Sequence, residues 1–393
     1  MRSTLKKIAL LYGGNSFFRA KLQERKAAIE LTYYRRQAVQ NGIASLKDKA
    51  LIFTLKKRLN DRGIFSIPKQ KGDLHIFLAY YISNWEAVLP KVLKSFGKVT
   101  EFEWRSRGFD EHAPNWLGCR ELMNKAMLNA FYEAQKEQPV DVVVGYLSGN
   151  NTNPEILKKM GKAAVIFNFC WDDKLSFRGK KIGNRWCGPA ALASAVDLNL
   201  TNAPGCRIKY MVEGGLAMFW PEAAHPDVHK LYDLPFEYDV SFIGGKYGWR
   251  PMFISKLQKL GVNITCFGNG WKNGPLSDEE MVRLYSISRI NLGFAGVVHS
   301  KRLMCLKGRD FEVPMSGGLY LTQHNPELFL IYDVGKEIMT YKDEKDCAEK
   351  IKRLLLQPDE ADRIREAGRK RALLDHTWER RFEEIFRLAG IME

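Results

Sequence analysis

One carboxylate, that of Glu312, stands out for its surroundings. It lies in residues 307–322, a segment that predicts a short helix, a break at Gly317-Gly318 and then a buried strand. A carboxylate held in this way can accept two hydrogen bonds from a vicinal diol such as that of a ribose. Arg309 precedes Glu312 by one helical turn, so the two side chains could equally form an (i, i+3) ion pair on a helix surface.

A glycine-rich turn follows a strand predicted over residues 240–244 and opens a predicted helix. Gly244 and Gly245 would let main-chain N–H groups approach a ligand, and a helix N-terminus favours phosphate. Lys246 and Arg250 would add two full positive charges. Because strand–glycine–helix turns are also common for structural reasons alone, the phosphate interpretation depends on what else lies nearby.

A second glycine pair follows the next predicted strand, at residues 264–268. Gly268 and Gly270 flank Asn269 and allow unusual backbone angles and a close approach of the main chain. Trp271 comes directly after them. Its ring could stack on a nucleobase or cover the core, and the sequence favours neither interpretation.

Positive charge gathers just before Glu312. Lys301, Arg302 and Lys307 fall in a loop predicted over residues 295–308. These cations, followed directly by Arg309, could neutralise a diphosphate without a metal ion.

Two adjacent carboxylates, Asp172 and Asp173, end another predicted buried strand. One of them could act as a general base that takes the proton of an acceptor hydroxyl. The alternative is that they cap a helix or pair with Lys174 or Arg178. Nothing in the sequence chooses between the two aspartates. The polar loop at residues 148–153 could bind sugar hydroxyls or could be only a turn.

The elements that must position these residues alternate between strand and helix. Buried strands are predicted over residues 74–80, 99–104, 140–146, 163–169 and 197–201, and again over 240–244, 264–268, 290–294 and 318–322. This alternation predicts an α/β fold with two parallel sheets, and a ligand cleft between them at the carboxyl ends of the strands. Prolines and few periodic apolar residues mark a linker at 221–238, which gives domains at 1–220 and 239–376 and a last helix at 377–393.

The net charge of +16 belongs to the start of the chain. Residues 1–72 hold 17 Lys+Arg and 4 Asp+Glu, whereas the remaining 44 basic and 41 acidic residues nearly balance. A short strand is predicted over 7–12 and a basic helical segment over about 17–62, with Ile52, Phe53 and Leu55 as an apolar stripe. The charge could be a solvated helical face, a contact with anionic lipid, or a nucleic-acid surface.

Composition narrows the class of protein. No apolar run reaches 18 residues, which argues against a membrane-spanning helix, and the first residues do not form a secretory signal. The seven cysteines are scattered singly without a CxxC pair, which argues against a disulfide framework or a structural zinc site. We therefore expect a cytoplasmic location, with peripheral contact to the inner face of a membrane as an added interpretation of the basic segment.

Several motifs together resemble a known family over residues 164–386. They are Asp239-Val-Ser-Phe-Ile-Gly-Gly with Trp249-Arg250, Cys266-Phe-Gly-Asn-Gly-Trp, Asn291-Leu-Gly-Phe, Gly308-Arg-Asp-Phe-Glu-Val-Pro with Gly317-Gly318, Asn325-Pro-Glu-Leu, Gly335-Lys-Glu-Ile and His376-Thr-Trp-Glu-Arg. The chain resembles the CgeB-like (spore maturation protein) group of glycosyltransferases related to families 1 and 4. Met304 stands where many relatives have the first glutamate of an E-x7-E pattern, and Cys170 or Trp171 where they often have histidine.

The resemblance implies a GT-B fold, with two Rossmann-like domains and a final helix that crosses back to the first. It implies sugar transfer from a nucleotide-sugar, which the C-terminal domain would bind with Glu312 on the ribose. The donor-binding set is then Gly244, Gly245, Lys246, Arg250, Gly268, Asn269, Trp271, Lys301, Lys307, Arg309, Glu312 and Gly317. The chain has no Asp-x-Asp, the pair that usually holds a divalent ion in single-sheet glycosyltransferases, so we expect no metal or other cofactor.

The favoured hypothesis is a metal-independent hexosyltransferase acting on a glycan or lipid-linked acceptor in cell-surface polysaccharide synthesis. A sugar-nucleotide epimerase of the same fold is one alternative. A non-enzymatic protein that binds membrane or nucleic acid through residues 1–72 is another, although we expect no nucleic-acid partner.

Overall fold

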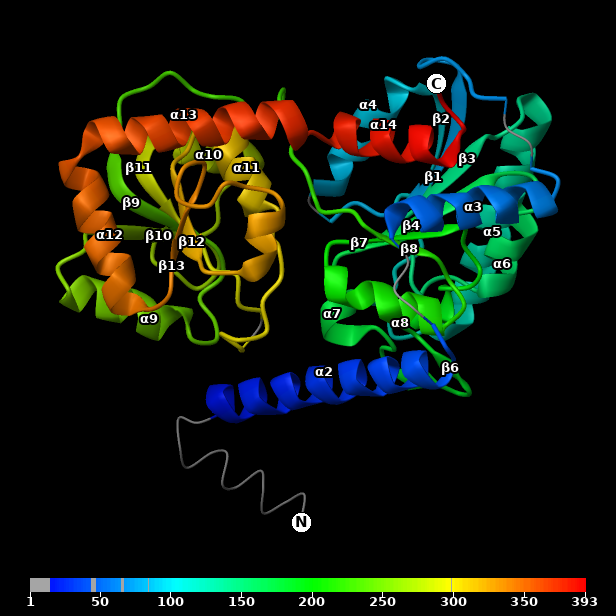
Figure 1. The fold of residues 1–393 in the computed structure, drawn as a ribbon, viewed down its shortest axis with the longest axis horizontal. Helices are drawn as coiled ribbons and strands as arrows, with labels where there is room; N and C mark the ends of the chain where they lie inside the picture. The colour runs from blue at the N-terminus through cyan, green and yellow to red at the C-terminus, as the bar shows by residue number, and fades with distance from the viewer. Residues whose placement is uncertain (1–14, 44–46, 65–66, 84, 298) are drawn as a thin grey trace, which may run out of the picture. The chain divides into compact units, whose positions relative to one another are not determined.

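The computed structural model describes residues 15–43, 47–64, 67–83, 85–297 and 299–393, so the strand expected over 7–12 lies outside it. Contacts divide the chain into two compact units (Figure 1). The N-terminal unit contains residues 29–221 and 378–393, and the C-terminal unit contains residues 222–377 together with those up to Ala28. Each unit has its own sheet.

The sheet of the N-terminal unit has six parallel strands in the order β2-β1-β3-β4-β7-β8. They are β1 (Leu74–Tyr80), β2 (Gly97–Glu103), β3 (Val142–Gly145), β4 (Val165–Cys170), β7 (Leu198–Thr201) and β8 (Ala217–Phe219). Every residue of β1 is buried, including His75, whose ring nitrogens lie 2.8 Å from Gln138 O and Thr100 Oγ1. The sequence did not predict β8.

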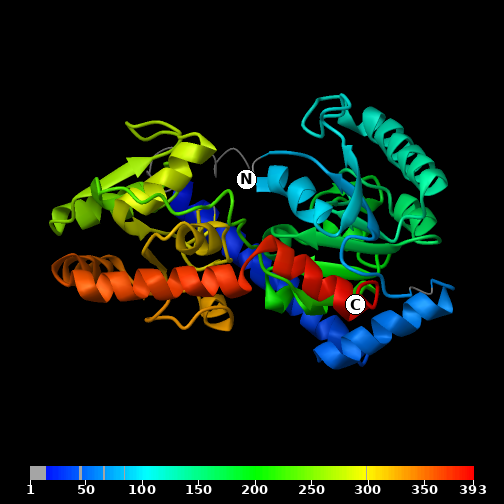
Figure 2. The same ribbon diagram turned by 90° about the horizontal axis from the view of Figure 1, so that it is seen from above.

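Helices cover both faces of this sheet, as Figure 2 shows for α5 on one side and for α3 and α14 on the other. Phe77 of β1 packs edge-on against Phe131 of α5 (Trp116–Glu137). Phe167 of β4 stacks on Phe386 of α14 (Trp378–Ala389), which also packs edge-on against Phe96. The last helix therefore returns to the N-terminal unit, as the fold class predicts.

The remaining elements of the N-terminal unit are short. They are η1 (Trp85–Val88), α4 (Leu89–Lys94), α6 (Pro154–Met160), α7 (Asp173–Ser176), the hairpin β5 (Lys181–Ile182) and β6 (Arg185–Trp186), η2 (Pro189–Ala191), η3 (Pro204–Cys206) and α8 (Arg207–Val212). At the start of η1, Ser83 N and Ser83 Oγ both donate to the Glu86 carboxylate, at 3.1 and 3.0 Å.

The basic segment forms two helices rather than one, α2 (Asn15–Gln40) and α3 (Asp48–Asp61). The buried stripe of α3 is Leu51, Leu55 and Leu59, spaced four residues apart, whereas Phe53 is 72% exposed. The stripe predicted from the sequence was therefore wrong except at Leu55. Since α3 contacts β8 and α14, its apolar face is occupied by its own unit.

The sheet of the C-terminal unit has five parallel strands in the order β10-β9-β11-β12-β13. The strands are β9 (Tyr238–Ile243), β10 (Ile264–Phe267), β11 (Ser288–Leu292), β12 (Tyr320–Gln323) and β13 (Met339–Tyr341). The helices are α9 (Arg250–Lys259), α10 (Asp278–Ile287), α11 (Arg309–Met315), η4 (Pro326–Leu330), α12 (Glu344–Leu356) and α13 (Pro358–Asp375). The α/β fold with two Rossmann-like parallel sheets is confirmed.

The stretch predicted as a linker, 221–238, is for the most part not a linker. From Glu222 onward it belongs to the C-terminal unit, where Ala224 forms a β-bridge with Thr377. Further along, Tyr232 N donates to Ser286 Oγ at 3.0 Å and Glu237 N donates to Ile287 O at 2.8 Å. The segment lacks helical or strand periodicity because it runs extended along a folded unit, not because it is unattached.

All seven cysteines are thiols. Within the described ranges, none of the helices combines the length and the apolar character needed to cross a membrane.

Leu55→Ala should separate packing of α3 from a surface role. We expect it to lower the free energy of unfolding by about 2–4 kcal/mol, because it leaves a cavity against the N-terminal unit. Phe53 lies on another face of α3 and is largely exposed. Phe53→Ala should therefore change the free energy of unfolding by less than about 0.5 kcal/mol. Urea denaturation followed by circular dichroism measures both, and equal effects of the two changes would contradict the packing of α3 described above.

Candidate active site

The two predicted glycine loops meet at the carboxyl ends of β9 and β10. Gly268 has φ +116°, and a Cβ there would lie 2.6 Å from the carbonyl oxygen of Gly244, so only glycine allows the approach. Lys246 N donates to Asn269 O at 2.8 Å, and Trp271 Nε1 donates to Gly244 O at 2.8 Å. The two loops therefore form one bonded surface.

Trp271 has a structural place in that surface. Its ring packs against the core of the C-terminal unit and lies edge-on to Phe242, with 6.2 Å between centroids. Lys246 Nζ lies 5.1 Å from the Trp271 ring centroid. Of the two interpretations left open by the sequence, this geometry agrees with a ring that covers the core.

Arg250 is a buried cation at the start of α9. One of its guanidinium nitrogens, Nη1, donates to Gly245 O at 3.2 Å, and the guanidinium carbon lies 4.2 Å from the Tyr247 ring centroid. Within the described residues no carboxylate pairs with it. Burial lowers the pKa of Arg250, and the charge of Arg309 acts in the same direction. A buried guanidinium without a counterion is suited to an anionic ligand.

The start of α11 adds further charge. Burial by itself would lower the pKa of Lys307, but Cys305 and then Glu222 raise it, and Lys307 Nζ lies 3.0 Å from Cys305 Sγ. Arg309 is partly buried, and its Nε atom has no hydrogen-bond partner. Asp310 accepts from Lys307 N at 2.8 Å, and burial raises its pKa to about 7. Lys307 and Arg309 thus place two cations at this end of α11.

A chain of hydrogen bonds links Glu312 to the C-terminal sheet. Tyr285 OH donates to Glu312 Oε2 at 3.3 Å. The carbonyl oxygen of Tyr285 accepts from Asn291 Nδ2 at 3.0 Å, and Asn291 Oδ1 accepts from Ser241 Oγ at 3.2 Å. The carboxylate is therefore linked to the interior of the sheet, across β11 and β9.

A second carboxylate, Glu222, faces the same place and was missed by the sequence analysis. A Cβ at Gly308 would lie 2.6 Å from Glu312 Oε1 and 3.1 Å from Glu222 Oε2. Both acids therefore lie against the bare side of Gly308. Glu222 had no sequence signal, because it is a single acidic residue at the start of a stretch predicted as a linker.

Two predicted donor-binding residues lie apart from this cluster. Lys301 Nζ pairs with Glu344 Oε1 at 3.1 Å, and the same oxygen lies 3.3 Å from Lys256 Nζ. Gly317 follows the C-terminal end of α11, so it lies at the opposite end of that helix from Arg309. Gly317 is separated from Arg309 because α11 connects the carboxyl end of β11 to the amino end of β12.

The N-terminal unit has a cavity of about 430 Å³ beside the carboxyl ends of β3 and β4. Its lining includes Tyr81, Glu111, His112, Tyr146, Ser148, Asn150, Asn151, Cys170, Asp172 and Lys180. The rings of Tyr81 and Tyr146 stack with 6.0 Å between centroids. Tyrosine faces, amides and acids in one cavity suit a sugar, which has both apolar faces and hydroxyl groups.

The two adjacent aspartates have different environments. Asp172 lines this cavity, whereas Asp173 is fully buried and accepts from Tyr210 OH at 3.0 Å. Burial raises the pKa of Asp173 to about 6, although hydrogen bonds from Thr201 and Tyr210 oppose the rise. The structure therefore leaves Asp172 as the candidate base and gives Asp173 a place in the core.

No group of three or more His, Cys, Asp or Glu side chains is placed to hold a metal ion in the part of the chain that the structure describes.

Comparisons with known proteins agree with this architecture. Residues 250–387 match a family described as glycosyl transferase-like. No curated protein matches the chain. The matched stretch runs from the start of α9 into α14, and most of it belongs to the C-terminal unit.

Similar solved structures have the GT-B fold. Sucrose-phosphate synthase from Thermosynechococcus elongatus is 11% identical with a TM-score of 0.55, over 80% of this chain and 98% of that one. Anabaena Alr3699/HepE in complex with UDP and glucose is 10% identical with a TM-score of 0.55, over 80% and 99%. A glycosyltransferase from Rickettsia africae is 11% identical with a TM-score of 0.51, over 81% and 98%. Identities this low establish the shared fold and nothing finer.

Asp173→Asn should change the pH dependence of stability in a defined direction. The folded pKa of about 6 exceeds the ordinary value of 3.8, so ionisation of Asp173 makes the wild type lose stability as pH rises through this window. Asparagine cannot ionise. We expect the stability of the variant relative to wild type to rise by about 3 kcal/mol between pH 3 and pH 7 and then level off. Urea denaturation at fixed pH values measures the difference, and a flat difference would refute the assignment.

Proposed function

We propose that the chain is a glycosyltransferase that moves a sugar from a nucleotide-sugar donor to a glycan or lipid-linked acceptor. The observation that carries the proposal is the cluster in the C-terminal unit: buried Arg250 without a carboxylate partner, and Arg309 and Lys307 beside the paired acids at Gly308. The glycosyl transferase-like match over residues 250–387 supports it. The motifs shared with CgeB-like proteins agree with a place in cell-surface polysaccharide synthesis.

The donor diphosphate would be bound mainly by side chains. In the glycine turn, the N–H groups of Gly244, Lys246 and Tyr247 already donate to carbonyl oxygens of Phe267, Asn269 and Gly245. The turn therefore does less of the phosphate binding than the sequence predicts, and it instead fixes Arg250 against Gly245 O. The guanidinium groups of Arg250 and Arg309 can accept the charge that develops on a departing nucleoside diphosphate, without a metal ion.

The ribose would be bound by Glu312, with Glu222 as a second acceptor. Carboxylate oxygens accept hydrogen bonds from a vicinal diol, and the two acids lie together against the bare side of Gly308. Lys307 lies close enough to Glu222 for the two charges to interact. Its ammonium group would allow two carboxylates to remain ionised near one another.

The acceptor would occupy the cavity of the N-terminal unit that Asp172 lines. Asp172 would take the proton of the attacking hydroxyl, and the amides and hydroxyl of the polar loop would bind neighbouring sugar hydroxyls. Asp173, buried behind it on Tyr210, would keep the start of α7 in place.

Glu312→Gln should weaken binding of the preferred donor about 10- to 100-fold, because two hydrogen bonds to a charged acceptor are reduced to weaker ones. Glu222→Gln should act in the same direction with a smaller effect. Isothermal titration calorimetry with UDP-, GDP- and dTDP-sugars measures both. Glu349→Gln, an exposed acid on α12, is the matched control. Unchanged affinity in Glu312→Gln would remove this residue from the ribose site.

Asp172→Asn should lower the turnover number for transfer by about 100-fold or more and leave donor affinity unchanged, because only proton removal is lost. Asp173→Asn should retain turnover. Product analysis with labelled donor, with and without a screened acceptor and in the presence of EDTA, measures both variants. Conversion of the donor without any acceptor would instead indicate an epimerase, and loss of activity in EDTA would contradict metal independence.

A further inference from the structure

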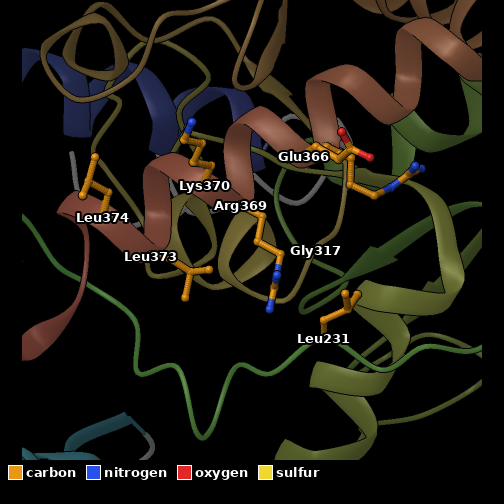
Figure 3. Close-up of a pocket in the computed structure, with 8 residues that line it drawn as sticks. Leu231, Gly317, Glu366, Arg369, Lys370, Leu373 and Leu374 are labelled. Carbon is orange, nitrogen blue, oxygen red and sulfur yellow. The ribbon is translucent and has the colours of Figure 1, made fainter.

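A second cavity of the C-terminal unit, of about 540 Å³, lies away from the cluster around Gly308. Its lining residues are Leu231, Gly317, Arg365, Glu366, Arg369, Lys370, Leu373 and Leu374 (Figure 3). Arg365 donates to the carbonyl oxygen of Arg289, next to the first residue of β11, which places the cavity at the amino end of the sheet. Because α/β sheets bind their main ligands at the carboxyl ends, this cavity is a separate site.

One wall of the cavity is formed by α13. The lining positions 366, 369, 370, 373 and 374 recur at three- and four-residue spacing along this helix. Figure 3 shows Arg369 and Leu373 extending to the same side of α13, and Lys370 extending to the other. Opposite lies Leu231, so close to Gly317 that a Cβ there would be 2.6 Å from Leu231 Cδ1. Leu231 and Gly317 thus pack directly against each other in the lining of the cavity.

The apolar part of the lining is open to solvent. Leu231 is 45% exposed, Leu373 39% and Leu374 57%. Three leucines gathered around one hollow are unusual on a soluble surface and favour an apolar ligand. A free phosphate or sugar phosphate would leave them uncovered.

The polar part of the lining is cationic and incompletely bonded. The Nε atoms of Arg365 and Arg369, one helical turn apart, are buried without a hydrogen-bond partner. The other nitrogens of Arg365 bind Asp362 and the carbonyl oxygen of Arg289, whereas Arg369 has no ion pair among the described residues. Glu366 is the single acid in the lining. Arg365, Arg369 and Lys370 therefore give the lining an excess of positive charge over Glu366, which an anionic group would balance.

We infer that this cavity binds an anionic phospholipid, with an acyl chain on the leucines and the phosphate on Arg365 and Arg369. An apolar surface beside an excess of cations favours a ligand that is both apolar and anionic. A neutral apolar molecule would leave that charge unbalanced. The site would attach the C-terminal unit to an anionic membrane surface independently of the basic segment at residues 1–72, and it does not rest on the proposed transfer reaction.

Calorimetry on the full chain with short-chain lipids below their micelle concentration tests this. Monomeric lipids avoid the general attraction of residues 1–72 to charged vesicles. We expect dioctanoyl phosphatidylglycerol to bind, dioctanoyl phosphatidylcholine to bind at least about tenfold more weakly, and glycerol 3-phosphate not to bind measurably. Leu373→Asp should weaken phosphatidylglycerol binding at least about tenfold. Arg369→Gln should reduce the preference for phosphatidylglycerol over phosphatidylcholine.

Two matched controls lie off the cavity: Leu356→Asp, at an 82% exposed leucine ending α12, and Arg363→Gln, at an exposed arginine of α13. Both should bind phosphatidylglycerol like the wild type. Circular dichroism melting checks that each variant folds. Equal binding by Leu373→Asp and wild type, equal affinity for the two lipids, or a loss shared by the control variants would overturn the inference. So would binding of an acidic amphipathic peptide, sensitive to Leu373→Asp, when the lipids do not bind.

Discussion

The candidate active site of the C-terminal unit depends on positive charge that is buried without matching negative charge. A guanidinium removed from water is unfavourable unless hydrogen bonds and nearby dipoles replace its hydration. For Arg250 the replacement comes from the carbonyl oxygen of Gly245 and the face of Tyr247. That explains why the turn needs glycine at 244 and 268: the two loops must approach closely enough to position Gly245. This arrangement leaves a buried guanidinium that no carboxylate of the described residues balances.

The same principle distinguishes the acids of the chain. Asp173 and Asp310 are buried, and burial raises the pKa of each toward neutrality. Each carboxyl group is therefore partly protonated near neutral pH. Asp172 lines a cavity, and Glu222 and Glu312 lie against the bare side of Gly308. Full burial thus separates Asp173 and Asp310 from the acids proposed to act in the site.

Local patterns in the sequence predicted most of the fold but only part of the site. The bounds of β1 and α11 follow from an apolar run and a glycine break, which are properties of adjacent residues. Glu222 could not be predicted, because its position against Gly308 depends on how the extended segment after Pro221 runs along its unit. The difference between Asp172 and Asp173 was equally hidden, since neighbours in sequence diverge only when the start of α7 is packed. Lys301 was expected at the donor and lies on Glu344, a partner 43 residues away.

The hydrogen bonds that run from Ser241 through Asn291 and Tyr285 to Glu312 link the position of this carboxylate to the packing of the sheet. These bonds fix the orientation of the Glu312 carboxylate from the interior of the sheet. The side chain has therefore already lost rotamer entropy before any ligand binds. If Glu312 binds the donor as proposed, a substitution that repacks β9 or β11 would change ligand recognition without altering any residue that touches the ligand. Changes in the core would then be a route to new specificity.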